Sequence, residues 1–481
     1  MSINLNLKST QSVIEGVLTK LAQTIEELFS RSETEAIELE GFERELHGVF
    51  AEAERGVMAD KLAQYDVDVP KLVINGKHYR RVLRAATTYT CAAGEVQVRR
   101  SLYRHQAESA MVPLEQNAGI VAGHWTPLAA RQMLVVTSQL PPAAGEALFD
   151  ELGMMRPSKS SLDRLPKALS AVWEGRRQPF EQQLREAETI PEEAVTVAVS
   201  LDGVMTPMKA GQRQAKREQT QAEGKRTRGP AGYQEVGCGT ISFYDAQGKR
   251  LQTRQLARMP EPKKKSLKCQ LQAEMDHILR QQGDLRIVTV ADGAKDNWTY
   301  LSTAFPNATA VVDFYHAADH LKEALDNAYG ENTPQAKAQF DKLRRRLLDE
   351  SDGVEAVIRS LRHLRQKHPG RKVIARELAY FRQYRHRMRY ADWKAQQLPI
   401  GSGVVEAACK TLVTQRLKGS GMRWSHRGGQ AILTFRALLQ SERFERAWSK
   451  LASTYVAPIR PSAAVIPFPQ SPRTTSSESA I

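Results

Sequence analysis

Three acidic residues stand in sequence contexts that could bring them into one site. Asp202 follows the β-rich run AVTVAVSL, and Asp292 follows LRIVTVA, each directly before a glycine. Glu406 stands behind a Gly-Ser-Gly turn in the small, apolar run GSGVVEAACK. Three carboxylates in one pocket would form a hard, oxygen-lined site suited to Mg²⁺ or Mn²⁺. Two such ions could activate water or a 3′-hydroxyl and stabilise the leaving oxygen in a phosphodiester displacement.

Each of these residues also has an ordinary structural explanation, and their neighbours offer alternatives. An Asp-Gly pair after a strand is often a turn, and a lone Glu in a helix is often solvated. Asp313, in the run VVDFYH, could take the place of Asp292 as the second carboxylate. His316 and His320, in HAADH, have the i, i+4 spacing of a helical zinc pair but lack the glutamate of the HExxH motif.

The segment from 194 to 316 predicts the elements that would position the two aspartates. AVTVAVSLDG and the two strands of EVGCGTISFYDAQGKRLQTRQLARM predict an antiparallel meander of three strands. A helix, the buried strand LRIVTVA, a second helix and the strand TAVVDF follow. The order β-β-β-α-β-α-β is that of an RNase H-like fold, which is an α/β fold. Its first and fourth strands are neighbours, so Asp202 and Asp292 would meet at one edge of the sheet.

Glu406 would reach the same edge from a helix. The run GSGVVEAACKTLVTQRL predicts this helix, with Val405, Ala408 and Leu412 as its apolar contacts. If these residues pack against the sheet, Glu406 projects over the edge where the two aspartates lie. Three buried negative charges are strongly unfavourable without cations to balance them, which again favours a divalent metal ion.

The whole chain has the length and the apolar content of several packed units. Its 481 residues exceed one ordinary core, and 41% of them are hydrophobic. A mostly helical region with a small β-hairpin unit and a helix-turn-helix is expected before the RNase H-like core, and an all-helical insertion within it. The expected divisions are 1–65, helical and a candidate for oligomerisation; 66–190, β-hairpin and helix-turn-helix; 191–316, first part of the core; 317–398, helical insertion; 399–455, second part of the core with the Glu406 helix; and 456–481, a disordered tail.

The charge distribution indicates a polyanionic partner. The net charge is +15, yet residues 1–60 carry −7, so the rest of the chain carries +22. A basic body of this size favours nucleic acid, held through its phosphates. No apolar run is long enough to span a membrane and the polar N-terminus is no signal peptide, so we expect a cytoplasmic protein with no membrane partner. The four cysteines are scattered without a CxxC pair, which argues against a zinc finger or a disulfide framework.

Two segments are candidate DNA contacts. LPPAAGEALFDELGMMRPSKSSLDRLPKAL predicts a helix from about 143 to 152, a turn at Gly153 and a second helix capped by Ser158, the shape of a helix-turn-helix or of an ordinary αα-hairpin. RLKGSGMRWSHRGG gathers basic residues around Trp424, which would stack on a splayed base or pack in the core. The residues expected to contact DNA are Lys159, Ser160 and Arg164 in the first segment, and Arg416, Lys418, Arg423, Trp424 and Arg427 in the second.

Taken in order, LDGV, VADGA, VVDFYH and GSGVVEAACK resemble the motifs of DDE transposases of bacterial insertion sequences, in particular the ISKra-type group, which is related to Mutator-like transposases. The resemblance covers most of the chain, from about residue 70 to about residue 450. It implies that Asp202, Asp292 and Glu406 are the catalytic, metal-binding triad, with Mg²⁺ or Mn²⁺ as the cofactor. Asp313 and His316 match the C/DxxH motif of the related elements, and we expect a supporting role for them.

These observations predict one function and leave two alternatives. The expected protein is a DNA transposase that binds terminal inverted repeats, cleaves strands and joins the freed 3′ ends to target DNA. Its partners would be double-stranded DNA of the transposon ends and the target, and pairing of two ends predicts a homo-oligomer, a dimer or larger. The alternatives are a DNA-binding regulator derived from a transposase but without catalytic activity, and an RNase H-like nuclease that needs no end recognition.

Overall fold

The computed structural model describes residues 3–35, 38–74, 76–106, 109–209, 211–225 and 232–459, and the chain divides into two compact units. Unit 1 comprises residues 1–133, 146–158 and 451–481, and unit 2 comprises 134–145 and 159–450. Among the helices in the described ranges, none combines the length and apolar character needed to cross a membrane. Three helices run across the division between the units: α4 (Pro127–Gln139), α5 (Pro142–Leu152) and α19 (Phe444–Ser453).

Unit 1 is built from two long helices and a three-stranded antiparallel sheet. Its sheet has the order β1-β2-β3, with tight connections between consecutive strands. Gly76 and Gly94, at these connections, have φ angles of 76° and 118°, a backbone conformation that favours glycine. The elements are α1 (Ile3–Glu35), α2 (Leu39–Ala63), β1 (Lys71–Ile74), β2 (Lys77–Cys91), β3 (Gly94–Arg104) and α3 (Pro113–Ala118).

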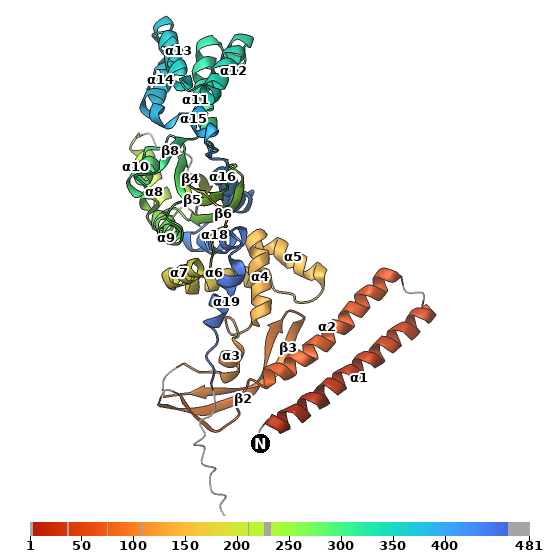
Figure 1. Cartoon of the computed structure of the whole chain (residues 1–481). Helices are drawn as coiled ribbons and strands as arrows, with labels where there is room; N and C mark the ends of the chain where they lie inside the picture. Colours follow the sequence, from red (N-terminus) through yellow and green to blue (C-terminus); the bar gives the residue numbers. More distant parts are fainter. Residues whose placement is uncertain are drawn as a thin grey trace, which may run out of the picture. The chain divides into compact units, whose positions relative to one another are not determined.

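Unit 2 contains a five-stranded mixed sheet in the order β6-β5-β4-β7-β8 (Figure 1). β4, β5 and β6 form an antiparallel meander, and β4, β7 and β8 run parallel. The first and fourth strands of this unit, β4 and β7, are therefore neighbours, as the sequence predicted. The strands are β4 (Thr196–Pro207), β5 (Tyr233–Tyr244), β6 (Arg250–Arg258), β7 (Arg286–Ala291) and β8 (Thr309–Val312).

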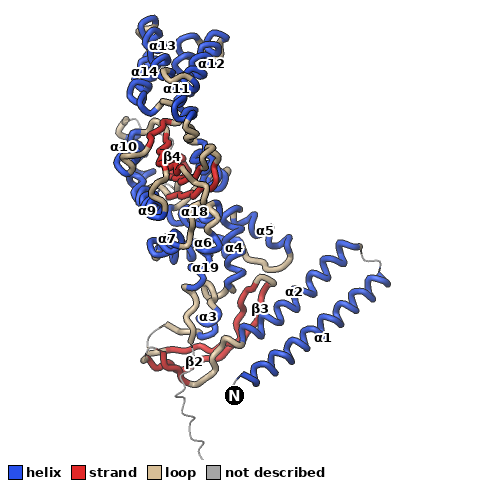
Figure 2. Tube along the Cα trace, in the orientation of Figure 1, coloured by secondary structure: helices blue, strands red, loops and turns tan. Residues whose placement is uncertain are grey.

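Helices cover both faces of this sheet (Figure 2). Ile241 and Phe243 of β5 pack in one core cluster with Leu267 and Leu271 of α9 (Lys265–Gln281). Successive strand residues point to opposite faces, so Val236 and Cys238 face the other way, where they pack with the helix α16 (Gly403–Ala408). A Cβ at Gly237 or Gly239 would lie 2.8 or 2.9 Å from the leucines of α9, so the close approach of α9 requires glycine at both positions.

A group of helices interrupts unit 2 between β8 and α16. The chain leaves the sheet at Phe314 and returns at Ile400, where the Phe314 amide donates a hydrogen bond of 3.0 Å to the Ile400 carbonyl. The five α-helices of the group all contribute apolar residues to one core cluster, which makes the segment between β8 and α16 helical. The helices are α11 (Phe314–Tyr329), α12 (Pro334–Asp349), α13 (Gly353–Lys367), α14 (Lys372–Tyr384), η2 (Arg385–Arg387) and α15 (Tyr390–Ala395).

The remaining elements of unit 2 lie before and after these segments. A π-helical stretch, Cys409–Thr414, directly follows α16 and continues into α17. The helix α18 packs against β6 and against α6. The elements are α6 (Lys159–Gly175), α7 (Arg177–Glu186), α8 (Gly211–Ala222), η1 (Pro262–Lys264), α10 (Lys295–Ala304), α17 (Gln415–Leu417) and α18 (His426–Gln440).

Two boundaries differ from the sequence prediction. β4 continues to Pro207, so Asp202 lies within the strand and not at its end, because pairing with β5 extends five residues beyond Asp202. The tail predicted to be disordered from residue 456 makes ordered contacts in its described part: the Ala457 amide donates to the Gln116 carbonyl at 3.0 Å, and Ile459 is buried. The rest of that tail, 460–481, lies outside the described residues.

Candidate active site

The strand registers of unit 2 place three aspartates in one row. Ser200 pairs with Val290 between β4 and β7, and Ala291 pairs with Val312 between β7 and β8. Continuing these registers by one or two residues puts Asp202 beside Asp292, and Asp292 beside Asp313. Neighbouring strands lie about 4.8 Å apart, so each aspartate is in the immediate vicinity of the next. We call these three residues the aspartate row.

Asp202 faces the side of the sheet that α16 covers. It lies opposite Cys238 in the β4–β5 register, and Cys238 packs on the α16 side. Its Oδ1 accepts a 2.6 Å hydrogen bond from the Gly203 amide, and its Oδ2 accepts one of 3.5 Å from the Cys409 thiol. Burial raises the pKa of Asp202, and the negative charge of Asp292 raises it further, although the Gly203 hydrogen bond opposes both. The positive charge of Lys264 also lowers the pKa of Asp202, but burial and the charge of Asp292 outweigh it.

The Cys409 thiol is held in its protonated form. A hydrogen bond with Cys238 and then burial raise the pKa of Cys409, and the charge of Asp202 adds to the effect. A protonated thiol can donate to Asp202, which fixes the start of the π-helical stretch against β4. Cys409 was considered in the sequence only as a scattered cysteine, because its partners come from distant strands.

Asp292 is oriented by the loop and helix that follow it. Its Oδ1 accepts hydrogen bonds from the Ala294 amide at 3.1 Å and from the Asn297 side chain at 3.3 Å. The same Asn297 amide group donates to the Leu201 carbonyl at 3.2 Å, so it joins the loop after β7 to β4. Asn297 is buried, at 2% exposure. The sequence analysis missed it, and its only signal was an amide residue at a core-facing position of a short helix.

Asp313 is a buried carboxylate at the junction between β8, α11 and α16. Its Oδ1 accepts a 2.8 Å hydrogen bond from the His316 amide, so Asp313 caps the N-terminus of α11. Its Oδ2 accepts short hydrogen bonds from both the amide and the hydroxyl of Ser402, the residue before α16. Asp313 has no exposed surface. It therefore ties the start of the Glu406 helix to the end of β8.

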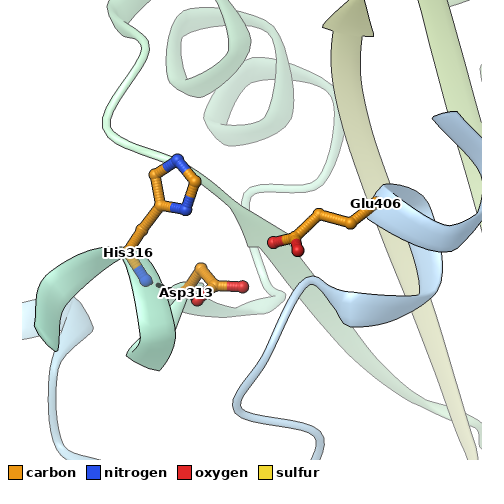
Figure 3. A group of neighbouring side chains, drawn as sticks. All are labelled: Asp313, His316 and Glu406. Carbon is orange, nitrogen blue, oxygen red and sulfur yellow. Dashed lines mark hydrogen bonds between the residues drawn. The ribbon is translucent and has the colours of Figure 1, made fainter. Parts of the chain in front are cut away.

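Glu406 is exposed, and its carboxylate points toward the Asp313 side of the row (Figure 3). Its Oε1 lies 2.7 Å from the Ser402 hydroxyl, which also contacts Asp313. A hydroxyl has one hydrogen, so Ser402 can donate to only one of the two carboxylates at a time. Ser402 is a residue that the sequence analysis treated only as part of a turn.

The Glu406 carboxylate lies nearer to Asp313 than to the other two members of the expected triad. One group of ligand atoms within 4.8 Å of one another belongs to Asp313, His316 and Glu406, and among the described residues Asp202, Asp292 and Glu406 form no such group, so the triad stays a prediction. The physical reason is the hydrogen bond from Ser402, which holds the Glu406 carboxylate next to Asp313.

The helix itself nevertheless lies next to Asp202. Val405, Ala408 and Leu412 are all at most 2% exposed and pack on the α16 side of the sheet, as the sequence predicted. Glu406 stands three positions before Cys409, whose thiol contacts Asp202. Side chains three positions apart on a helix have Cβ atoms about 5–6 Å apart. Glu406 and Cys409, the residue that contacts Asp202, are therefore neighbours along this helix.

The helical insertion contributes tyrosines to the middle of the row, beside Asp292. The Tyr384 hydroxyl donates to the Gly293 carbonyl at 2.9 Å, and the Tyr380 ring would lie 2.6 Å from a Cβ at Gly293. Burial raises the pKa of Tyr380, and the charge of Asp292 raises it further. Glycine at 293 is therefore required by the approach of α14, which was not visible in the sequence.

The two histidines considered as a zinc pair belong to different groups. His316 lies with Asp313 and Glu406, whereas His320 lies with Glu323 and Glu377. His320 Nδ1 is 2.5 Å from a Glu377 carboxylate oxygen, and its ring stacks on Tyr380. A shared zinc site for the two histidines receives no support from the described residues.

Arg416, expected to contact DNA, is instead a buried structural residue. It is 2% exposed, and its Nε and Nη2 donate to the Thr137 carbonyl at 3.3 and 3.1 Å. Burial lowers the pKa of Arg416 to about 10. Trp424 lies 5.3 Å below its guanidinium and donates its indole N–H to the Leu417 carbonyl at 2.9 Å. Trp424 is therefore half-buried and held by packing contacts, and the buried Arg416 side chain is not available to a phosphate.

The other residues expected to contact DNA are exposed. Lys418, Arg423 and Arg427 lie on the surface around α17 and the start of α18. Lys159, Ser160 and Arg164 lie on the surface of the first turns of α6. The helices α5 and α6 begin and end close to the predicted residues, but the division between the units separates Gly153 from Lys159, so the helix-turn-helix stays a prediction.

Comparisons with known proteins identify no family. No protein-family model matches the chain, and no curated protein matches it. Among solved structures, the chain is similar to the Drosophila P element transposase strand transfer complex, with 10% sequence identity, a TM-score of 0.24, and coverage of 69% of this chain and 82% of that one.

Proposed function

We propose that the protein is a DDE-type DNA transposase with an RNase H-like core, of the insertion-sequence group that its motifs resemble. In this proposal it binds the terminal inverted repeats of a transposon and catalyses metal-dependent strand cleavage and strand transfer. One observation carries the proposal: Asp202 and Asp292 follow paired positions on the adjacent parallel strands β4 and β7, and Glu406 belongs to the helix that packs on the same face of the sheet. In the proposal, the Glu406 carboxylate joins the two aspartates when DNA and metal ions bind.

The residues at this edge fit a divalent metal ion. Asp202 and Asp292 offer hard oxygen ligands, and the pKa of Asp202 is raised by burial and by the neighbouring charge of Asp292. Asp202, Asp292 and Glu406 would hold the ions, with Mg²⁺ or Mn²⁺ as the best match to an all-oxygen set. When bound, the ions would supply activation of water or of a 3′-hydroxyl and stabilisation of the leaving oxygen.

The surrounding residues would orient these ligands. Gly203 and Cys409 hold the two oxygens of Asp202, and Ala294 and Asn297 hold Oδ1 of Asp292. In this scheme, Glu406 leaves its Ser402 contact and turns toward the two aspartates.

DNA is the substrate that the charge supports. The net charge is +15, and a basic body attracts a polyanion over a long range. The same site could serve a nuclease without end recognition, and a regulator would retain binding without chemistry. The products of the reaction distinguish these three functions.

The test uses labelled DNA from the two segments that flank the coding sequence, where the ends of an element would lie. The protein is incubated with this DNA, a target plasmid and Mg²⁺. We expect labelled ends joined to the plasmid. Degradation irrespective of sequence would replace the transposase with a nuclease, and a bound, uncut complex would replace it with a regulator.

Matched variants connect the products to the site. Asp202→Asn, Asp292→Asn and Glu406→Gln remove one charge each with little change of shape, and each is expected to abolish cutting while DNA binding stays within a few fold. Asp296→Asn is the control, because Asp296 is an exposed aspartate near Asp292 whose carboxylate pairs with Lys268. Full cleavage by one of the three variants would remove that residue from the triad.

A further inference from the structure

The sheet of unit 1 has one face that is only partly covered. Near the turn that joins β2 to β3, this face carries Val96 and Val98, which pack with Leu62 of α2 and Leu114 of α3. Toward the outer end, where β1 joins, the same face is exposed, and Figure 2 shows the strands extending beyond the end of α2. We call this outer part the open face; its exposed residues are Lys71, Val73, His78, Arg80, Leu83 and Arg104.

The strand registers align three cations on the open face. Lys71 is directly opposite Arg80, and Arg80 is directly opposite Arg104. Residues directly opposite share a face, and strands lie about 4.8 Å apart, so the three cations form one row about 10 Å long. We call it the cation row.

The cation row has no internal charge partner. Among the described residues, no carboxylate lies within ion-pair distance of any of its three members. The arginines that point to the opposite face differ, since Arg81 pairs with Asp68, and Arg84 lies 2.7 Å from Asp68 and 3.6 Å from Asp66. Like charges directly opposite one another on a sheet destabilise it. The cation row is therefore unfavourable for the pairing of these strands, and no ion pair within the described chain balances it.

The opposite face of the sheet is firmly anchored. Tyr103 is fully buried there, and its hydroxyl lies 2.7 Å from the Val67 carbonyl and 2.6 Å from the Val69 carbonyl. Leu72 and Ile459 complete this small core. The segment before β1 thus fixes one side of the strands, so the cations on the other side project from a well-packed sheet.

We propose that the open face binds the phosphodiester backbone of duplex DNA, with the cation row of Lys71, Arg80 and Arg104 contacting successive phosphates. Phosphate oxygens accept hydrogen bonds from Arg and Lys, and such contacts position a protein on the duplex. Val73 and Leu83, which are 43% and 54% exposed, add apolar contact area beside the row. The choice of DNA over another polyanion rests on the proposed function. The open face belongs to unit 1, whereas the predicted contacts on α6 and around α18 belong to unit 2.

The experiment measures binding without catalysis. Fluorescence anisotropy is recorded with a labelled 30-base-pair duplex of mixed sequence, in EDTA, over 50–200 mM salt. Each lost phosphate contact lowers the slope of log affinity against log salt by about 0.9. Neutralising the row in Lys71→Gln/Arg80→Gln/Arg104→Gln should therefore lower the slope by up to about 2.7, which makes the loss of affinity between these salt concentrations about 40-fold smaller than in the wild type.

Two controls make the result specific. Arg99→Gln removes an exposed cation from β3 on the opposite face, and it should change the slope by less than one contact. The triple variant should also unfold at the same or a higher temperature than the wild type, because it removes like-charge repulsion. An unchanged salt slope in the folded triple variant would overturn the proposal and favour an acidic protein surface as the partner of the cation row. EDTA keeps the binding measurement independent of cleavage. The DNA-binding proposal for the open face can therefore be refuted while the proposed reaction is supported, and the proposed reaction can be refuted while binding by the open face is supported.

Discussion

Removing the Asp313 carboxylate should loosen the helix that carries Glu406. Asp313 has no exposed surface and accepts hydrogen bonds from the amide and hydroxyl of Ser402 and from the His316 amide. Ser402 is 4% exposed, so in Asp313→Ala its two donors would be left buried without an acceptor. We predict that α16 opens more readily in this variant, and that Asp313 acts as a positioning residue.

The size of the effect follows from these contacts. A hydrogen bond to a charged group contributes about 1.5–3 kcal/mol, and an N-cap contributes about 1 kcal/mol. Because the bonds share one carboxylate, the values do not add fully, and a loss of about 3–5 kcal/mol is expected. At 1.36 kcal/mol per tenfold change, the local opening constant should rise at least about 150-fold.

Hydrogen–deuterium exchange of peptides covering 400–417 measures this opening directly. Faster exchange by about two orders of magnitude is expected for Asp313→Ala, with a smaller increase for Asp313→Asn, which retains one acceptor oxygen. Glu406→Gln is the matched control, and because Glu406 is exposed its exchange should change by less than about threefold. Exchange in Asp313→Ala that stays within threefold of the wild type, together with lost DNA cleavage, would refute the positioning role and assign Asp313 to the chemistry.

Two further predictions concern Asp202 and Arg416. The pKa of Asp202 is raised in the folded protein, so the folded state holds this proton more tightly and the free energy of unfolding falls as the pH rises from the ordinary value of 3.8 through the raised pKa. Asp202→Asn should therefore be more stable than the wild type at pH 7 in EDTA, with a smaller difference in stability at pH 4, and Mg²⁺ should stabilise only the wild type. Denaturant midpoints measured at the two pH values check this prediction. A variant that is less stable than the wild type at pH 7 would contradict it. Arg416→Gln should lower the free energy of unfolding by about 2–4 kcal/mol and leave DNA affinity per folded molecule unchanged, whereas Lys418→Gln, an exposed control, should stay within about 0.5 kcal/mol in thermal denaturation. Normal stability with weakened DNA binding in Arg416→Gln would return this residue to the DNA surface.

The amino-acid sequence by itself determined which elements form and the order in which they follow one another. The alternating apolar residues of β4 and the buried run of β7 are local patterns. The rules for connecting strands, such as right-handed crossovers between parallel strands, leave only a few topologies for this order of elements. The predicted pairing of these two strands followed from that order, and with it the proximity of Asp202 and Asp292. The turn at Gly153 and the start of α6 at Lys159 were equally local, because glycine and capping residues act on their own neighbours.

Only the tertiary structure decided where individual side chains went. The Glu406 carboxylate lies beside Asp313 because Ser402, four residues before it, bridges them, and no periodicity encodes that contact. Arg416 resembles any surface cation in sequence, yet it is buried against a helix almost 280 residues away. The cation row exists only through the registers of three strands, since a slip of one residue would move Arg80 to the other face. Such outcomes depend on contacts between distant segments, which compete with local preference and are set when the whole unit packs.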